Sequence, residues 1–153
     1  MPDIIIGLDY SRRKIGVATG QTLTNTASAL TTVMNLEAGK INWGKLDEII
    51  SQWHPVALVV GLPLDMDGSE QATTKAARQF GKQLEKRYSQ TIHFMDERLS
   101  SREASHILGY EGITSPRRNS RPGKKVKKNK RTGNDIDSVA AQLILQSWLN
   151  EQS

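Results

Sequence analysis

The pattern of apolar and polar positions predicts a chain that begins with strands and continues with alternating helices and strands. Apolar runs at residues 4–9 and 15–20, joined by a polar turn, predict two strands, and residues 27–33, rich in Thr and Ser, predict a weaker third. The continuous apolar run at residues 56–60 is typical of a strand that is covered on both faces. Residues 92–95 predict one more short strand.

Apolar residues that recur at offsets of three and four predict three amphipathic helices. The residues that mark them are Ile41, Leu46, Ile49, Ile50 and Trp53 in the first helix, Thr73, Ala76, Ala77, Phe80 and Leu84 in the second, and Ile136, Val139, Ala140, Leu143, Ile144 and Ser147 in the last. The first helix is expected to end at His54-Pro55, because the residue before a proline disfavours helical geometry. Ser100 and Glu103 are spaced as in a capping box and predict a further helix start. This order of elements favours a mixed-sheet α/β domain.

The composition is that of one globular domain over residues 1–153. Apolar residues make up 37% of the chain, and the length is sufficient for a substantial core. The absence of cysteine excludes disulfides and thiolate metal sites. No apolar run approaches the roughly 20 residues of a membrane helix, and the N-terminus lacks the pattern of a signal peptide. We therefore expect a cytoplasmic protein without a membrane partner.

The positive charge of the chain is concentrated in one segment, at about residues 115–133, which holds nine Lys or Arg and no acid. These residues are Arg117, Arg118, Arg121, Lys124, Lys125, Lys127, Lys128, Lys130 and Arg131. Because nine positive charges exceed the net charge of +5, the rest of the chain is acidic, at −4. The Gly, Pro and Asn content of the segment predicts a flexible loop that binds the backbone of a nucleic acid. The alternative is a solvated loop that only aids solubility.

Carboxylates stand at the edges of three apolar elements that must pack together in one domain. They are Asp9, at the end of the first strand, Asp96 and Glu97, at the end of the strand near residue 95, and Asp135 and Asp137, at the start of the last helix. Converging carboxylates repel one another, and hard divalent cations such as Mg²⁺ choose oxygen ligands. Acids that hold a metal, together with bases that bind phosphate, suggest a metal-dependent nuclease.

Each acid also has a structural interpretation. Asp9 precedes a turn, in which it is suited to bind nearby amides. Asp96 and Glu97 are adjacent in a strand, so only one of them readily faces a shared site. We favour Glu97, and the other acid pairs with Arg98 or caps the next helix. An acid in the first turn of the last helix is stabilised by the helix macrodipole, by about 0.3–1 kcal/mol, and Asp137 is the better candidate there to turn inward.

The remaining polar candidates are Arg98 and three histidines. Arg98 either neutralises phosphate charge or pairs with Asp96. His54, His93 and His106 have no partner at the spacing of metal ligands, so we interpret all three as structural.

At these residues the chain resembles the YqgF/RuvX family, small proteins with a ribonuclease H-like fold. The resembling motifs are Leu8-Asp9-Tyr10 with Ile15-Gly16-Val17-Ala18, Val59-Val60-Gly61-Leu62-Pro63-Leu64 with Gly68, Asp96-Glu97-Arg98-Leu99-Ser100 with Glu103-Ala104, and Asp137-Ser138-Val139-Ala140-Ala141 with Ile144-Leu145-Gln146. Several ordered motifs are more specific than any one of them. Relatives commonly have glycine two residues after the first acid, where this chain has Ser11; its hydroxyl offers another way to bind phosphate.

The resemblance implies an α/β fold of the ribonuclease H-like type, with a central five-stranded mixed sheet flanked by helices. It implies that Asp9, Glu97 and Asp137 form the catalytic triad and hold one or two Mg²⁺ or Mn²⁺ ions. In a site with two ions, one activates water and the other stabilises the leaving oxygen.

Family members have been proposed as nucleases that mature the 5′ end of the 16S ribosomal RNA precursor and as Holliday-junction resolvases. We expect a hydrolase of the first kind, which acts on precursor rRNA in ribosome biogenesis, with four-way DNA as the alternative substrate. A further alternative is a non-catalytic nucleic-acid-binding factor in ribosome assembly or transcription. Processing of one RNA strand needs only a monomer, which we favour, whereas a resolvase works naturally as a symmetric dimer. The sequence leaves open the metal, the endo- or exonuclease mode and the oligomeric state.

Overall fold

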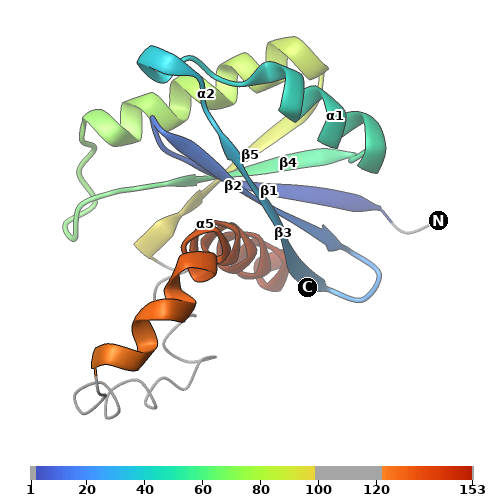
Figure 1. Cartoon of the computed structure of the whole chain (residues 1–153). Helices are drawn as coiled ribbons and strands as arrows, with labels where there is room; N and C mark the ends of the chain where they lie inside the picture. Colours follow the sequence, from blue (N-terminus) through green and yellow to red (C-terminus); the bar gives the residue numbers. More distant parts are fainter. Residues whose placement is uncertain (1–2, 99–121, 153) are drawn as a thin grey trace.

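One mixed sheet of five strands forms the centre of the protein (Figure 1). The computed structural model describes residues 3–98 and 122–152, with side chains described in the second range from Ile136 onward. The strands are β1 (Ile4–Tyr10), β2 (Lys14–Gln21), β3 (Thr26–Met34), β4 (Ala57–Leu62) and β5 (Thr91–Asp96). Their order in the sheet is β3-β2-β1-β4-β5; β1 is antiparallel to β2, and β4 and β5 run parallel to β1. The predicted five-stranded mixed sheet is confirmed, and each predicted strand lies within two residues of the observed bounds.

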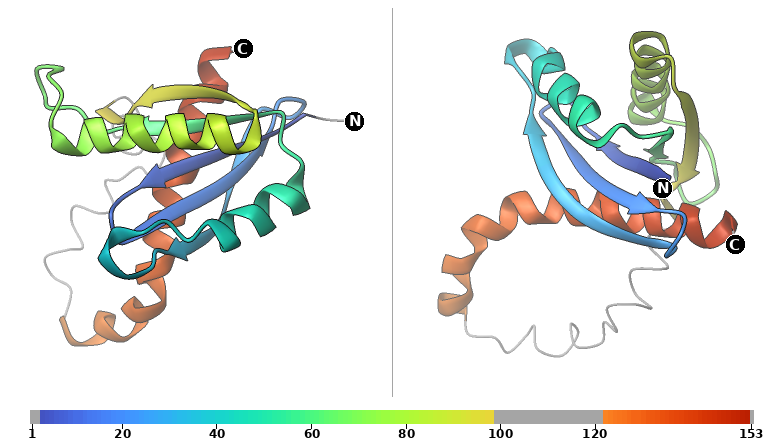
Figure 2. Two further views of the ribbon diagram at one scale, coloured as in Figure 1. Left: turned by 90° about the horizontal axis from the view of Figure 1, so that it is seen from above. Right: turned by 90° about the vertical axis from the view of Figure 1, so that its right-hand side faces the viewer.

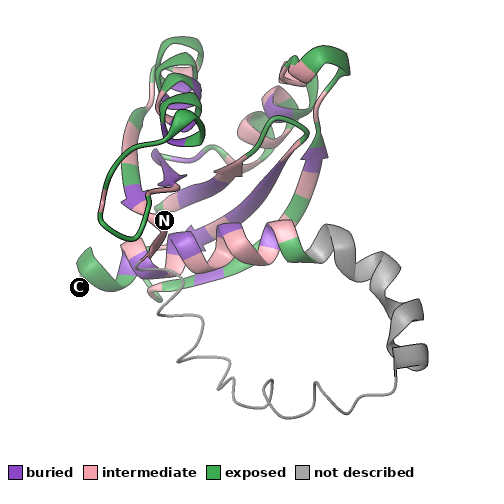
Figure 3. Cartoon of the chain, turned by 90° about the vertical axis from the view of Figure 1, so that its left-hand side faces the viewer, coloured by how far each residue is buried: buried purple, intermediate pink, exposed green. Residues whose placement is uncertain are grey.

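Helices cover both faces of the sheet. Figures 1 and 2 show α1 (Trp43–Trp53) and α2 (Ala72–Tyr88) on one face and α5 (Pro122–Gln152) across the other. A short 3₁₀ helix, η1 (Glu37–Gly39), lies between β3 and α1. All six residues of β4 are buried, as expected of a strand covered on both faces, and Figure 3 shows the buried residues gathered along the central strands.

Alternation along β1 divides the core into two layers. Ile6 and Leu8 pack toward α1 and α2, in a cluster with Phe80 of α2. Ile5 belongs to the second cluster, with Leu145 of α5. This alternation fixes the face to which the end of each strand directs its side chains.

Three of the five residues predicted for the inner stripe of α2 are buried, namely Ala77, Phe80 and Leu84, and the other two are not. Thr73 and Ala76 are exposed, whereas Thr74 is fully buried. The Thr74 hydroxyl donates to the carbonyl oxygen of Pro63 and accepts from the backbone N–H of Gln71, in a capping box that sets the rotation of the helix. Periodicity alone cannot reveal that a polar residue is satisfied in this way.

The stripe of α5 that faces the sheet also differs from the prediction. Ile136 is 61% exposed, and Val139 and Leu143 are only partly buried. Ser138 and Ala141 are buried instead. Small residues face the sheet because the helix backbone lies very close to the strands, which leaves little room for larger side chains.

The helix α5 also begins earlier than predicted. Residues 122–133, which the sequence predicts as part of a basic loop, belong to this helix, and Pro122 stands at its first position, where the missing N–H of proline costs nothing. Residues 115–121 and the predicted capping box at Ser100 and Glu103 lie outside the described residues. Within the described part of the chain, no helix is long and apolar enough to cross a membrane.

We predict that Phe80→Ala lowers the free energy of unfolding by about 3–5 kcal/mol. Phe80 is 1% exposed and stacks on Tyr10, with ring centroids 4.7 Å apart, and on Trp43 at 6.3 Å, so truncation leaves a cavity between α2 and β1. Urea unfolding measures the loss. Phe94→Ala is the matched control, because Phe94 is 36% exposed and its truncation should cost much less. Equal losses in the two variants would contradict this account of the core.

Candidate active site

The carboxylates converge at one edge of the sheet, where the parallel strands β1, β4 and β5 end. Asp9 lies near the end of β1, and Glu97 directly follows β5. Gly7, two residues before Asp9, lies against Leu145 of α5, and Met95, two residues before Glu97, belongs to the cluster packed on α5. Alternation therefore places Asp9 and Glu97 on the same face of the sheet, the face covered by α5.

The side chains of Asp9 and Glu97 are joined by a hydrogen bond. Asp9 belongs to β1 and Glu97 follows β5, and β4 lies between these two strands, so one side chain must cross β4. Gly61 of β4 makes this possible: a Cβ atom there would lie 2.7 Å from Oε2 of Glu97 and 2.5 Å from Cδ1 of Ile144. The absence of a side chain at Gly61 lets Glu97 lie over β4 and reach Asp9.

Burial raises the pKa of both carboxyl groups. For Glu97, burial is the largest cause and the negative charge of Asp9 the next, and they raise its pKa to about 8. For Asp9, burial and the charge of Asp137 raise the pKa, against the hydrogen bond from Glu97, which lowers it. At neutral pH the protonated Glu97 thus donates a hydrogen bond to the Asp9 carboxylate.

Asp137 lies beside this pair but is held by a lysine. Its backbone carbonyl packs on Gly16 of β2, where a Cβ atom would lie only 2.0 Å from that oxygen, and Gly16 is the register partner of Asp9. Nζ of Lys14 lies 2.9 Å from Oδ2 of Asp137. The sequence patterns gave no role to Lys14, and Gly16 and Gly61 stood there only as members of the family motifs. Alternation in β2 could have placed Lys14 on this face, because Gly16 and Ala18 share it.

The residues present fit a hard divalent cation by their chemistry. Asp9, Glu97 and Asp137 supply only carboxylate oxygens, the ligands that Mg²⁺ and Mn²⁺ prefer. Among the described residues, however, no three His, Asp or Glu side chains lie close enough together to hold one ion. The negative charge is balanced instead by a proton on Glu97 and by the Lys14 ammonium. A divalent cation has the charge to replace both.

Asp96 and Arg98 form an ion pair of their own. Nε and one terminal nitrogen of Arg98 donate to the Asp96 carboxylate at 3.0 and 2.6 Å, and the other terminal nitrogen donates to the carbonyl oxygen of Met66 at 2.9 Å. Of the two alternatives for Arg98, the structure thus contains the pairing with Asp96. Of the two adjacent acids, Glu97 is the one bonded to Asp9.

Ser11 and the histidines have structural roles in the described part of the chain. The Ser11 hydroxyl donates to the carbonyl oxygen of Lys14 at 2.7 Å and closes the turn between β1 and β2. Ser11 is not among the residues with positive φ, so serine fits this position without backbone strain. The rings of His93 and Trp148 pack against each other with their centroids 4.8 Å apart, and His54 caps the C-terminal end of α1. His106 lies outside the described residues.

The structure describes no side chain of the predicted nucleic-acid-binding residues in the basic segment. Arg117, Arg118 and Arg121 lie outside the described residues. The others belong to α5, and their side chains are likewise outside the described part: Lys124, Lys125, Lys127, Lys128, Lys130 and Arg131. Their role in binding stays a prediction.

We predict that Glu97→Gln flattens the dependence of stability on pH in EDTA. Because the folded-state pKa of Glu97 is raised to about 8, the folded protein holds a proton that the unfolded chain has lost between the ordinary glutamate pKa and that value. The free energy of unfolding of the wild type therefore falls as pH rises through this window. Urea midpoints at pH 5, 6.5 and 8 measure the slope, with Glu85→Gln, at an exposed glutamate of α2, as control. Parallel profiles for Glu97→Gln and wild type would show that the pair does not share a proton.

Known structures with the same fold include RuvC of Thermus thermophilus. The chain in the structure of that protein "in complex with Holliday junction substrate" superposes with a TM-score of 0.57 and 14% identity, over 99% of this chain and 97% of that one. A second structure of Thermus thermophilus RuvC gives a TM-score of 0.53 and 11% identity, over 97% of this chain and 95% of that one. At this identity the likeness concerns the fold, and it confirms the predicted ribonuclease H-like architecture.

Sequence relatives match over nearly the full chain. Proteins of Nitrosococcus oceani, Legionella pneumophila and Coxiella burnetii are 44%, 41% and 38% identical, over 99%, 97% and 97% of this chain and 89%, 96% and 94% of their own. Each bears the name "Putative pre-16S rRNA nuclease". A family model described as "RuvX: Holliday junction resolvase" matches residues 3–151. The chain therefore belongs to the RuvX family.

Proposed function

We propose that the protein is a metal-dependent nuclease that hydrolyses phosphodiester bonds in precursor 16S ribosomal RNA. The observation that carries the proposal is the hydrogen-bonded pair of Asp9 and Glu97, with Asp137 beside it, at one edge of the sheet. Buried carboxylates destabilise a fold unless they are compensated, so a cluster of three favours a function that requires their charge. The family and the names of the relatives support the same class of reaction.

In this proposal Asp9, Glu97 and Asp137 hold one or two Mg²⁺ or Mn²⁺ ions. A divalent cation in such a site activates water and stabilises the leaving oxygen. The protein itself contributes rigid positions: Asp9 sits on a central strand, Glu97 is laid over Gly61, and Asp137 is held close to Gly16 by α5. Glu97 must lose its proton and Asp137 must leave Lys14 before the three carboxylates can act together. Lys14 is then free to face the substrate phosphate.

Two nucleic acids are candidate substrates. Ribosomal RNA is favoured by the names of relatives at 38–44% identity, whose chains this one matches nearly end to end. Four-way DNA is favoured by the description of the family and by the ligand of the RuvC complex, a protein only 14% identical. We rank RNA first because the relatives that support it are much closer in sequence. A monomer suffices for that substrate.

We predict that Asp9→Asn abolishes metal-dependent cleavage while leaving the fold intact. The substitution removes one ligand charge at constant size, so activity should fall by at least two orders of magnitude. End-labelled precursor 16S rRNA and a four-way DNA junction are incubated in parallel with Mg²⁺, Mn²⁺ or EDTA. Cleavage of the RNA alone supports the processing nuclease, and selective cutting of the junction supports the resolvase.

Asp3→Asn is the matched control for this experiment. Asp3 precedes the same strand, β1, at its other end and is exposed, so the same chemical change there should leave cleavage unchanged. Full activity of Asp9→Asn would refute the assignment of the carboxylates. Tight binding without cleavage of either substrate, in any of the metals, would favour the non-catalytic assembly factor.

We further predict that the basic segment contributes phosphate contacts to binding. Replacement of Lys124, Lys125 and Lys128 by Gln should lower the slope of log K against log salt by about 0.7 per lost contact on single strands, or 0.9 on duplex DNA. Filter binding in EDTA at four salt concentrations measures it. The charge-matched control replaces Lys45, Lys82 and Lys86, exposed on α1 and α2. An unchanged slope in the first variant would assign the segment to solubility alone.

A further inference from the structure

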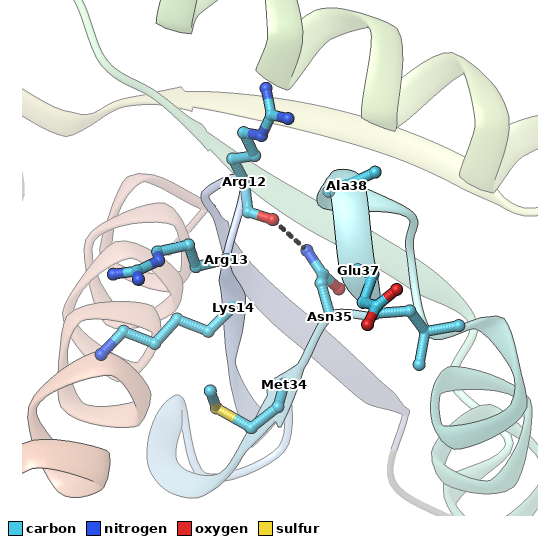
Figure 4. Close-up of a pocket in the computed structure, with 9 residues that line it drawn as sticks. Arg12, Arg13, Lys14, Met34, Asn35, Glu37 and Ala38 are labelled. Carbon is cyan, nitrogen blue, oxygen red and sulfur yellow. Dashed lines mark hydrogen bonds between the residues drawn. The ribbon is translucent and has the colours of Figure 1, made fainter.

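The turn between β1 and β2 carries three consecutive basic residues and borders a hollow. The hollow has a volume of about 550 Å³, and Arg12, Arg13 and Lys14 line it together with residues 34–39. Figure 4 shows Arg13 and Lys14 extended toward α5, while Arg12 points to the other side of the turn. A second hollow, of about 410 Å³, lies on that other side and is bordered by Arg12 and the start of α2. Lys14 pairs with Asp137 in the carboxylate site, whereas Arg12 and Arg13 are not part of that site.

The two arginines of this turn differ from the other described arginines. Arg78, Arg87 and Arg98 each bind a carboxylate at 2.6 to 2.7 Å. Arg12 and Arg13 are exposed, and neither forms an ion pair within the described part of the chain. An arginine that is paired at the surface serves the fold, whereas two adjacent unpaired guanidinium groups are free to bind an anion.

The structure holds this turn in one shape. The side-chain amide of Asn35 donates to the carbonyl oxygens of Ser11 and Arg12 at 3.2 and 3.1 Å, and its backbone N–H donates to that of Arg13 at 2.9 Å. Gly39, with φ of 75°, lies under Arg12, and a Cβ atom there would lie 2.9 Å from the Cγ and Nε atoms of the arginine. Residues 35–39 thus form a support that is fitted to the turn.

The turn is directly connected to the carboxylate site. Arg13 precedes Lys14, whose ammonium group contacts Asp137, and Tyr10 at the other end of the turn follows Asp9. The turn therefore borders the carboxylate site, where it can meet a nucleic-acid strand bound there. Glu37 also lines the hollow; because Lys14 is paired with Asp137, two arginines border the hollow against one acid, a balance that favours an anion.

We propose that Arg12 and Arg13 bind backbone phosphates of the nucleic-acid strand next to the bond that is cut, and that Asn35 positions them. The inference rests on the proposed nuclease function and adds a binding site to it. Guanidinium groups suit phosphate because they offer paired N–H donors, and two of them on opposite sides of one turn match neighbouring phosphates of a strand that crosses it. The contacts carry no base specificity.

The test compares the salt dependence of binding in two charge-matched variants. The first is Arg12→Gln with Arg13→Gln; the control is Lys82→Gln with Lys86→Gln, two exposed residues on the part of α2 that leads away from the site toward the start of β5. Binding of single-stranded precursor rRNA is measured in EDTA. The slope of log K against log salt should fall by about 1.4 in the first variant, from two lost contacts at about 0.7 each, and stay unchanged in the control.

Further variants separate a direct contact from a structural role. Arg12→Lys with Arg13→Lys keeps both charges and should restore the slope of the wild type. Asn35→Ala keeps both arginines but removes the support of the turn. It should weaken binding, while the slope should fall by less than the 1.4 expected for two lost contacts. An unchanged slope in the glutamine variant, or an equal fall in the lysine control, overturns the proposal. If either of these results is found while the wild type cleaves RNA, the nuclease function stands and only the phosphate site is refuted. If the slope falls in the glutamine variant but the wild type does not cleave RNA, the phosphate site stands and the nuclease function is refuted.

Discussion

The close contact between α5 and the sheet is the constraint on which the site depends. At Gly16 the backbone of the helix comes so near to β2 that a single added Cβ atom would lie 2.0 Å from the Asp137 carbonyl oxygen. Because Gly16 is the register partner of Asp9, this contact is also what brings a carboxylate from residue 137 to one from residue 9. It explains why small residues, Ser138 and Ala141, face the sheet at this end of the helix. A bulkier interface would hold the helix, and Asp137 with it, away from the strand.

A second constraint is the charge that this packing assembles. Three carboxylates at one edge would repel one another, and the protein compensates them in two different ways. The Asp9–Glu97 pair keeps one proton, because burial and mutual repulsion raise the pKa of Glu97 to about 8. The Asp137 carboxylate forms an ion pair with the ammonium group of Lys14. Both compensating charges are removable, one by ionisation and one by rotation of a flexible side chain. The negative charge of the three carboxylates is thus compensated by one proton and one ammonium group.

The sequence predicted the five strands and the approximate places of α1, α2 and the C-terminal part of α5, because alternation and helical periodicity are local properties. Alternation predicts only that Asp96 and Glu97 point to opposite faces; which of the two reaches Asp9 follows from the structure, in which Glu97 is bonded to it. What local patterns could not provide is the rotation of α2 and α5, which depends on contacts between distant residues: Thr74 with Pro63, and Asp137 with Gly16. The same limit hid Lys14 and Asn35, whose partners lie far along the chain or on backbone atoms.

The pairing of Arg98 bears on where phosphate is bound. The charge of Asp96 is one of the causes that raise the pKa of Glu97, although the smallest. An Arg98 that turned to a substrate phosphate would take its positive charge away from Asp96, which lies next to the carboxyl group that ionises in the proposed mechanism, and would make that ionisation harder. Arg98 therefore serves the site best where it lies, bound to Asp96 on the opposite face from Glu97. Among the described arginines, Arg12 and Arg13 are then the two that can bind a phosphate, because neither forms an ion pair with a carboxylate in the described part of the chain.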